Sequence, residues 1–495
     1  MKETQVRTRF APSPTGMMHI GNLRSALYEY LVAKSQNGAF VLRIEDTDRA
    51  RYVEGAEQVI YQTLATVGLK HDEGPDIGGP YAPYVQSERL NKYLPYAEQL
   101  IRDGYAYYDF EPMTEQDGIE DANFGPEHSR RSRDLDPETV TANLAAGKPY
   151  VIRQKMPLSG ETTFVDLVFG EISVENKELE DQILIKSDGF PTYNFANVID
   201  DHEMNITHVV RGSEYLSSTP KYNLLYQAFG WDVPTYIHLP LINGTDGKKL
   251  SKRHGATSFE QLVAEGYLPE AITNYIAFLG WAPGSDTREI FTLDELVEVF
   301  DVKGIGKAPA VFDYAKLDWY NQQYLLKLSP AEFSDLIAPT ITELFGERHC
   351  DLAVLAEVLQ TRICKLKEIP EMLGFALRRG EMDSELFTHK KSKLNPSVCL
   401  RVLERCYEDL FKKNIAATTA SFEREKLHEY LMSLGAELEL KTGQVMGPIR
   451  LACARQQVTP GGATELLLIL GRHEAQARIE EAIAYLKSIE GANNE

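Results

Sequence analysis

The segment RFAPSPTGMMHIGNLRSAL (9–27) constrains the fold most, because it places a strand, a proline-rich turn and a helix start in immediate succession. Residues 8–11 are predicted to form a short strand, and the prolines and glycine of 12–16 a turn. After the turn, apolar residues recur at the spacing that buries one face of a helix. These residues are Leu23, Ala26, Leu27, Tyr30 and Leu31. The order is typical of an α/β unit.

The start of this helix is a candidate anion-binding site. We expect the helix to begin near Gly21 and Asn22, with Asn22 as its cap, and to stop at Asn37-Gly38. Free N–H groups and partial positive charge at a helix start suit a phosphate, and Gly21 lets a ring or a phosphate come close. His19 can donate a hydrogen bond to a phosphoryl oxygen. The alternative for these residues alone is an ordinary strand–helix turn with a surface histidine.

Length, charge and cysteine use limit the class of protein. A chain of 495 residues is expected to contain roughly three or four domains. A net charge of −21 disfavours general coating of DNA or membranes, although a local basic surface can still bind nucleic acid. The five cysteines form no CxxC pair, which is typical of a reduced cytosolic protein without a disulfide framework. No apolar run resembles a signal peptide or a membrane span, so we expect a cytoplasmic protein.

Strand and helix signals alternate along the first part of the chain. A buried strand is predicted at 39–44, with helices at 55–67 and 90–104. This order favours a parallel sheet wound with helices. Short alternating runs such as 150–156 then predict antiparallel strands. The α/β alternation resumes at 192–241, and the pattern is mostly helical after about residue 260.

The predicted fold class is therefore α/β: a split Rossmann-type domain with an inserted α+β domain, followed by all-helical C-terminal domains. The predicted domains are 1–104 (first half of the split Rossmann-type domain), 105–190 (insert), 191–241 (second half), 242–325 (helical domain with a basic loop) and 326–495 (helical region of two subdomains).

A second motif, GTDGKKLSKRHG (244–255), is a basic loop flanked by glycines. It is not a P-loop, because Ile242 stands where the first glycine would be needed. Lysines act as point charges on phosphate, and the glycines allow a loop to open and close. The motif is interpreted as a mobile phosphate clamp, with a solvated basic turn as the alternative.

Together, in this order and across a split α/β domain, the two motifs resemble the HIGH and KMSKS elements of class I aminoacyl-tRNA synthetases. His19–Asn22 (HIGN) matches HIGH, with Asn22 in place of the second histidine, and Lys249–Arg253 (KLSKR) matches KMSKS. Further segments resemble bacterial glutamyl-tRNA synthetases over nearly the whole chain. They are RIEDTD (43–48), PTYNFANVIDD (191–201), THVVRG (207–212), VFDYAKLDWYNQQYL (311–325) and GQVMGPIRLA (443–452).

The resemblance implies a glutamate–tRNA ligase, which uses ATP to activate L-glutamate as glutamyl-adenylate and transfers it to the 3′ end of tRNA(Glu). Implied catalytic residues are His19, Lys249 and Lys252. The implied ATP site comprises His19, Gly21, Asn22, Lys249, Leu250, Ser251 and Lys252. The implied glutamate site comprises Arg9, Ala11, Ser13, Glu45, Tyr193, Asn197, Arg211 and Glu214, with Tyr215 as a further contact. Arg211 is expected to hold the side-chain carboxylate. Glu45 would face the ammonium or, alternatively, pair with Arg43 or Arg49.

Cofactors and partners follow from the same resemblance. Mg²⁺ would be bound through ATP, and no structural zinc is expected, because 104–112 lacks the cysteines of the zinc knuckle found in many family members. The insert would hold the acceptor end of tRNA, and the helical region would read the anticodon, where splayed bases can stack. Basic clusters at 130–133, 378–379 and 390–393 could touch phosphate, but a solvated loop is favoured for each. A monomer without DNA or membrane partners is expected.

Three other protein classes share parts of this pattern. A glutamyl-queuosine tRNA synthetase has the same catalytic core, but the helical extension to residue 495 argues against it. A non-catalytic paralogue is disfavoured by the intact His19, Gly21, Lys249 and Lys252. A nucleotidyltransferase of the same superfamily that activates another acid is disfavoured by the arginine pair, Arg9 and Arg211. Whether tRNA(Gln) is charged as well stays open.

Overall fold

The chain opens with a buried parallel pair of strands joined by a helix, as the first segment predicts. Strand β1 (Arg7–Phe10) pairs with β2 (Ala39–Leu42), and α1 (Ile20–Lys34) connects them. Four of the five residues of the predicted apolar face are buried, and Tyr30 is half-buried. Burial of such side chains contributes about 1.5–3 kcal/mol each, which holds α1 against the sheet.

The start of α1 lies within two residues of the predicted one, but the predicted cap is wrong. The helix begins at Ile20, and its N-cap is His19 rather than Asn22. His19 has an extended backbone, and its ring Nδ1 accepts the N–H of Gly21 at 3.0 Å, so that the imidazole satisfies a donor that the helix leaves open. The helix ends at Lys34, and Asn37 then adopts the left-handed conformation of the following turn.

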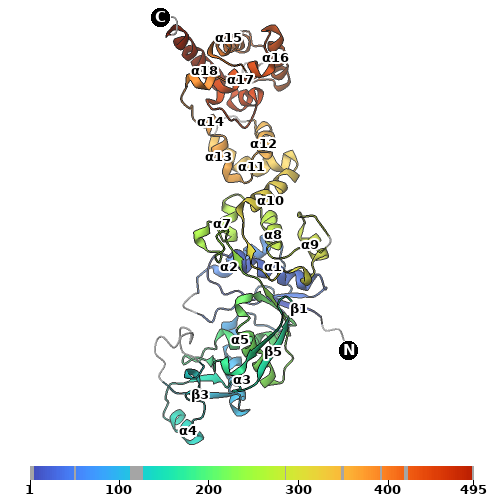
Figure 1. The fold of residues 1–495 in the computed structure, drawn as a ribbon, viewed down its shortest axis with the longest axis vertical. Helices are drawn as coiled ribbons and strands as arrows, with labels where there is room; N and C mark the ends of the chain where they lie inside the picture. Colours follow the sequence, from blue (N-terminus) through green and yellow to red (C-terminus); the bar gives the residue numbers. More distant parts are fainter. Residues whose placement is uncertain are drawn as a thin grey trace. The chain divides into compact units, whose positions relative to one another are not determined.

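The computed structural model describes residues 5–48, 52–111, 126–284, 286–346, 351–390, 393–416 and 422–492. The chain divides into two compact units. The first comprises Met1–Ala264 with Leu268–Leu317, and the second Glu265–Tyr267 with Asp318–Glu495. Figure 1 shows that the strands belong to the first unit, whereas the regular elements described in the second are helices.

The first unit continues after β2 with helices and strands in alternation. Its further elements are α2 (Ala56–Thr66), α3 (Leu90–Arg102), β3 (Ala106–Asp109), α4 (Pro137–Ala145), β4 (Val151–Gln154), β5 (Glu161–Asp166), β6 (Gly170–Glu175), β7 (Ile183–Ile185), α5 (Tyr193–Glu203), β8 (His208–Gly212), α6 (Thr219–Phe229), β9 (Thr235–Leu239), β10 (Ile242–Asn243), α7 (Phe259–Ala264), α8 (Pro269–Ala277), α9 (Leu293–Val299) and β11 (Ala310–Val311). Helix α10 (Tyr314–Lys327) carries the chain from the first unit into the second.

The second half of the catalytic sheet incorporates a hairpin from the predicted insert. Strands β8 and β9 are parallel, and the N–H of Thr207 donates to the carbonyl of Arg7, which brings the start of β8 beside β1. The antiparallel hairpin β5–β6 joins β9 through Asp166 and Tyr236, giving the strand order β6-β5-β9-β8. Strands β3, β4 and β7 form a separate antiparallel sheet. The segment 105–190 is thus divided between two sheets.

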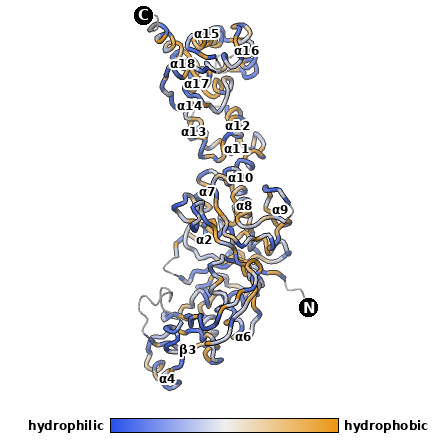
Figure 2. The backbone as a smooth tube through the Cα atoms, viewed as in Figure 1, coloured by the Kyte–Doolittle hydropathy of each residue, from blue (hydrophilic) through white to orange (hydrophobic). Residues whose placement is uncertain are grey.

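The second unit is a stack of helices with alternating hydrophobic and hydrophilic residues (Figure 2). Its helices after α10 are α11 (Pro330–Phe345), α12 (Leu352–Gln360), α13 (Ile369–Met372), α14 (Gly374–Leu377), α15 (Pro396–Tyr407), α16 (Arg424–Glu437), α17 (Thr442–Ala454) and α18 (Ala463–Ala492). In its core the buried Arg478 donates to the carbonyls of Phe375 and Cys453. The observed fold, an α/β region with a split sheet followed by helical domains, is therefore the fold class that the sequence predicts.

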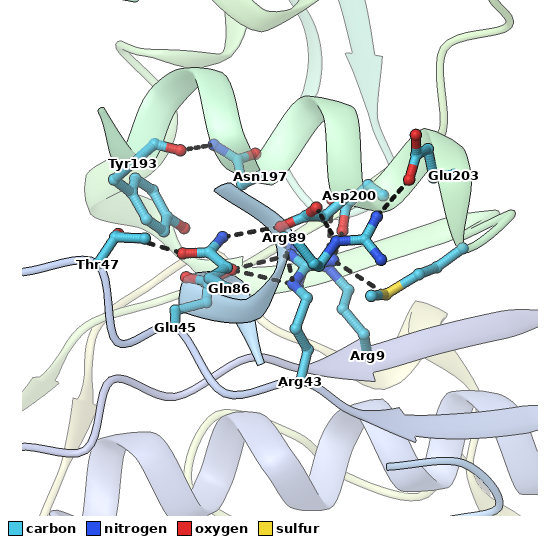
Figure 3. Close-up of polar contacts among 12 residues, drawn as sticks. Arg9, Arg43, Glu45, Thr47, Gln86, Arg89, Tyr193, Asn197, Asp200 and Glu203 are labelled. Atoms are coloured by element: carbon cyan, nitrogen blue, oxygen red, sulfur yellow. Dashed lines mark hydrogen bonds and ion pairs between the residues drawn. The ribbon is translucent and has the colours of Figure 1, made fainter. Parts of the chain in front are cut away.

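A network of buried charges joins the two halves of the split domain (Figure 3). Asp200 of α5 accepts hydrogen bonds from Arg89 at 2.7 Å and from Gln86 at 3.0 Å. Its neighbour Asp201 accepts from Arg9 of β1 at 3.0 Å and from Arg43 at 2.7 Å. Because α5 follows the insert and the arginines precede it, these bonds close the domain around the inserted segment.

Asp200→Ala should destabilise the first unit by about 3–5 kcal/mol, because it removes the buried carboxylate to which Arg89, Gln86 and Tyr93 donate, and Arg89 keeps its pair with Glu203 at 2.5 Å but loses Asp200. Asp232→Ala, an exposed acid in the same unit, should stay within about 0.5 kcal/mol of the parent. Urea unfolding followed by tryptophan fluorescence measures both, since Trp231 and Trp281 lie in the first unit. Equal midpoints for the two variants would contradict the importance of the network.

Candidate active site

A polar cavity of about 640 Å³ lies beyond the carboxyl ends of β1 and β8, at the N-terminus of α1. Ligands of open α/β sheets bind at this position, outside the carboxyl ends of the strands. The predicted residues that line it are Arg9, Ala11, Ser13, His19, Gly21, Asn22, Glu45, Tyr193, Arg211, Glu214, Tyr215, Lys249 and Leu250. Asn197 and Ser251 are not among its lining residues, and the side chain of Lys252 lies outside the described part of the chain.

His19 presents one ring nitrogen to the helix and the other to its surroundings. Because Nδ1 accepts the N–H of Gly21, the proton of the neutral ring is on Nε2. Burial lowers the pKa of His19 below its ordinary value of 6.5, and the positive charge of Lys249 acts in the same direction. A neutral histidine with a free N–H donor therefore stands at the helix start near neutral pH. Asn22 is exposed at the rim of the cavity.

The basic loop is tied to the start of α1 by backbone hydrogen bonds. The N–H of Ile20 donates to the carbonyl of Thr257 at 3.0 Å, and that of Phe259 to Met18 at 2.9 Å. The carboxylate of Glu260 also accepts the N–H of Met18. These contacts lie directly after the KLSKR sequence, so the two motifs share one anchor although some 230 residues separate them along the chain.

Within the loop, Asp246 holds the turn together. Its carboxylate contacts the ring of His254 at 3.0 Å and the guanidinium of Arg253 at 3.5 Å. The N–H of Gly244 donates to Lys248, closing a tight turn at the base of the loop. Lys249, which follows this turn, is exposed and lines the cavity.

Arg9 and Glu45 each form an ion pair within the protein. Arg9 donates to Asp201 at 3.0 Å and lies 3.6 Å from Glu29, while Arg43 donates twice to one oxygen of Glu45, at 2.9 and 3.2 Å. Burial opposes ionisation of Asp201, but Arg9 and Arg43 outweigh it and lower its pKa. Glu45 thus pairs with Arg43 and also faces the cavity.

Arg211 is a buried cation of the cavity, and within the described chain it has no carboxylate at ion-pair distance. Its guanidinium donates to Thr219 at 2.9 Å and to the ring of His238 at 3.1 Å. Three tyrosine rings surround it, with centroids 4.7 to 5.4 Å away; they belong to Tyr215, Tyr222 and Tyr236. Aromatic faces stabilise a cation only in part, and a buried charge is costly without a counter-ion. The site would therefore gain from an anionic ligand.

Asn197 contributes to the site through the helix that carries Tyr193. Its side-chain amide donates to the carbonyl of Tyr193 at 2.7 Å, one turn earlier in α5, so it shapes the helix that carries Tyr193. Glu214 lies exposed on the cavity wall just after β8.

Several cavity residues were missed by the sequence analysis. Glu29 and Arg24 of α1 both line the cavity and are buried. Arg24 donates to the carbonyls of Leu279 and Pro240, and Glu29 has one oxygen without a hydrogen-bond partner, with burial raising its pKa well above the usual range. The available signal was two charged residues inside an otherwise apolar helix. Thr47, Asp48 and Gln86 also line the cavity, without any such signal.

The predicted basic clusters form intramolecular contacts. Arg130 and Arg133 lie 3.8 and 3.6 Å from the buried Asp181, and Arg379 pairs with Glu474 at 2.7 Å. The expectation of a solvated loop is therefore wrong for Arg130 and Arg133, whereas Arg379 is exposed, as a residue of a solvated loop would be. Lys391 lies outside the described residues.

The described residues contain neither a metal-binding cluster nor a membrane-spanning helix. No group of three or more His, Cys, Asp or Glu side chains there is placed to hold a metal ion. No helix in this part of the chain has the length and apolarity needed to cross a membrane. The expectation that the protein carries no structural zinc stays a prediction, and residues 112–125, next to the cysteine-free segment, lie outside the description.

Two family models match the chain. The model described as "tRNA synthetases class I (E and Q), catalytic domain" matches residues 5–319, and "Anticodon binding domain" matches 315–483. The chain is 52% identical over 490 residues to a glutamate–tRNA ligase of Clostridium novyi, covering 98% of this chain and 99% of the relative. It is 53% identical, with the same coverage, to that of Clostridium botulinum.

Solved structures of the same kind are similar throughout. A crystal structure of a glutamate tRNA ligase from Elizabethkingia meningosepticum in complex with its amino acid matches with a TM-score of 0.84 and 37% identity, over 98% of this chain and all 100% of that one. The glutamate-tRNA synthetase of Elizabethkingia anophelis matches with a TM-score of 0.85. The resemblance carried by the two sequence motifs is thereby confirmed. With a family model over more than half of its length and relatives at 52% and 53% identity, the chain belongs to the glutamate–tRNA ligase family of class I tRNA synthetases.

Proposed function

We propose that the cavity is where this chain joins L-glutamate to the AMP moiety of ATP, before the glutamyl group passes to the 3′ end of tRNA(Glu). The observation that carries this proposal is Arg211, a buried cation without an acidic partner in the described chain, in the same cavity as the start of α1 with His19 and Lys249. One feature suits a carboxylate and the other a phosphate.

The reaction needs positioning more than acid–base chemistry. The α-carboxylate of glutamate attacks the α-phosphorus of ATP, and the bond to the leaving pyrophosphate breaks. Because the carboxylate is already a nucleophile, catalysis rests on alignment and on stabilising charge at the phosphoryl oxygens. In this proposal the Nε2–H of His19 donates to those oxygens, and Lys249 and Lys252 supply positive charge. Gly21, Asn22, Leu250 and Ser251 complete the ATP site.

Mg²⁺ would enter with the triphosphate and neutralise part of its charge. The cavity fits this arrangement, because its basic groups and helix N-terminus are suited to phosphate oxygens rather than to a metal ion. ATP would thus bring the metal ion into the site.

The residues of the proposed glutamate site have different roles. Arg211 holds the side-chain carboxylate, and Glu45 faces the ammonium group with its position fixed by Arg43. Arg9 supports the site through Asp201, and Tyr193 and Glu214 form its walls together with Ala11 and Ser13. Asn197 contributes indirectly, through α5.

The remaining parts of the chain serve tRNA in this proposal. Residues 105–190 hold the acceptor end, 242–325 contact the stem, and 326–495 read the anticodon, consistent with the match to an anticodon-binding family over 315–483. We propose that the protein acts in the cytoplasm as a monomer, without DNA or membrane partners.

Glutamate-dependent ATP–pyrophosphate exchange tests the proposed function. It is run without tRNA, with tRNA(Glu) and with tRNA(Gln). Exchange with tRNA(Glu) alone is the expected result, and exchange with both tRNAs would indicate a ligase that also charges tRNA(Gln). Strong exchange without tRNA would favour the queuosine-type enzyme, and no exchange under any condition would contradict the proposal.

Arg211→Ala should raise the KM for glutamate about 100-fold, because the substrate carboxylate loses a charge-assisted hydrogen-bond partner. The KM for ATP should change little. Arg288→Ala provides the control, since Arg288 is an arginine of the same unit that lies outside the cavity and pairs with Asp286. An unchanged KM for glutamate in Arg211→Ala would show that another group binds the side chain.

Lys249→Ala should raise the pKa of His19 toward 6.5, because removing a neighbouring positive charge favours the protonated ring. Lys248→Ala, an exposed lysine of the same loop that does not line the cavity, should leave that pKa unchanged. NMR titration of the His19 ring protons measures both values. A titration in Lys249→Ala identical to that of the parent would refute the coupling.

A further inference from the structure

A buried chain of polar groups leads away from the cavity behind Arg211. The Nε–H of Arg211 donates to Nε2 of His238 at 3.1 Å, and Nδ1 of His238 lies 2.7 Å from Asp166. His238 of β9 and Asp166 at the end of β5 are both buried, with 0% and 1% of their surface exposed. Neither residue lines the cavity, so neither can contact a substrate there.

The donors and acceptors along this chain can be assigned from the chemistry of the groups. A guanidinium only donates, so Nε2 of His238 must be an acceptor and the ring proton must be on Nδ1, directed at Asp166. Burial lowers the pKa of His238, and the charge of Arg211 acts in the same direction against the opposing effect of Asp166. The ring is therefore neutral, in a single tautomer.

Both carboxylate oxygens of Asp166 have hydrogen-bond partners. One carboxylate oxygen accepts the backbone N–H groups of Val168 and Phe169 at 2.9 and 2.7 Å. The other accepts the backbone N–H of His238 at 3.0 Å as well as its ring. Burial raises the pKa of this acid, but these hydrogen bonds outweigh it and lower the pKa overall. Asp166 thus forms a fixed anionic base for the chain.

We propose that His238 and Asp166 are positioning residues for substrate recognition, which hold the guanidinium of Arg211 in the orientation that receives the side-chain carboxylate of glutamate. The proposal rests on the proposed function. His238 fixes Nε and Thr219 accepts from Nη2, so the plane of the guanidinium is set before the ligand arrives. Nη1 and the second hydrogen of Nη2 are then left for the substrate. Pre-orientation of this kind lowers the entropic cost of binding.

The first test compares two substitutions of His238. His238→Leu removes the acceptor for Arg211, whereas His238→Gln retains an oxygen that can accept in the place of Nε2. The KM for glutamate should rise about tenfold to hundredfold in His238→Leu and return to within a few-fold of the parent in His238→Gln. In both variants the KM for ATP and kcat at saturating glutamate should change little. If His238 had only a structural role, His238→Gln would not be expected to restore the KM for glutamate. The effect of His238→Leu would also not be limited to that KM.

Substitution of the acid provides a second, independent variant. In Asp166→Asn, either orientation of the amide places an NH₂ group against donors that Asp166 now accepts, so the KM for glutamate should rise as in His238→Leu. Thr162→Val is the matched control, because Thr162 is a buried residue of the same strand whose hydroxyl donates to Asn176, away from the cavity. Its KM for glutamate should equal that of the parent.

A spectroscopic measurement does not depend on variant activity. In protein labelled with ¹⁵N-histidine, the ring of His238, assigned by its absence in His238→Gln, should show a protonated Nδ1 and an unprotonated Nε2. A proton on Nε2, or on both nitrogens, would overturn the proposal even if His238→Leu fails to fold.

The exchange assay on the unmodified chain separates the two proposals. Absence of exchange in the parent would contradict the proposed function. Exchange in the parent, with an unchanged KM for glutamate in His238→Leu or a fall in kcat alone, would overturn only the positioning role. A selective rise in that KM, with rescue by glutamine, would support it.

Discussion

The two neighbouring aspartates of α5 are the constraint on which the catalytic unit depends. Asp201 binds Arg9 and Arg43, and Asp200 binds Arg89, so one turn of helix after the insert holds three arginines that precede it. Buried ion pairs of this kind add little stability over apolar packing, but their loss is costly because a single charge then remains buried. Their contribution here is to the alignment of the two halves, because each pair joins α5, which follows the insert, to an arginine that precedes it.

The same alignment brings the binding groups together. Arg43, fixed by Asp201, in turn fixes Glu45 at the cavity, and α5 carries Tyr193 to its wall. The side of the cavity where we propose that glutamate binds is therefore fixed by ion pairs of the domain core. The side proposed for phosphate combines the start of α1 with a loop in which Lys248, Lys249 and Arg253 are exposed. Such a division suits an enzyme that must recognise a small acid accurately and also follow the changing charge of a reacting triphosphate.

Local patterns allowed much of this fold to be predicted. The bounds of β1, α2 and α3 lie within two residues of the predicted ones, because periodicity and glycine signals are local. The cap of α1 was missed because His19 is not a usual capping residue, and Asn22 is. The attachment of the β5–β6 hairpin to β9 was missed because strand pairing between distant segments leaves no mark in either segment. Motif residues such as His19 and Arg211 could be singled out from the sequence. Asp166 and His238 could not, since neither belongs to a recognised motif and their role depends on a contact between two strands that are distant in the sequence.

The hairpin β5–β6 has a consequence for how a protein of this kind can be cut and recombined. Residues 105–190 look like a cassette between two halves of a domain, and a chimaera that exchanged the whole cassette would carry away an edge of the catalytic sheet. The donor hairpin would have to reproduce the pairing of Asp166 with β9 and its contact with His238. The hairpin itself does not line the cavity. Junctions that leave 161–175 with the catalytic unit would keep the sheet whole. The separable module is therefore smaller than the interruption in the sequence.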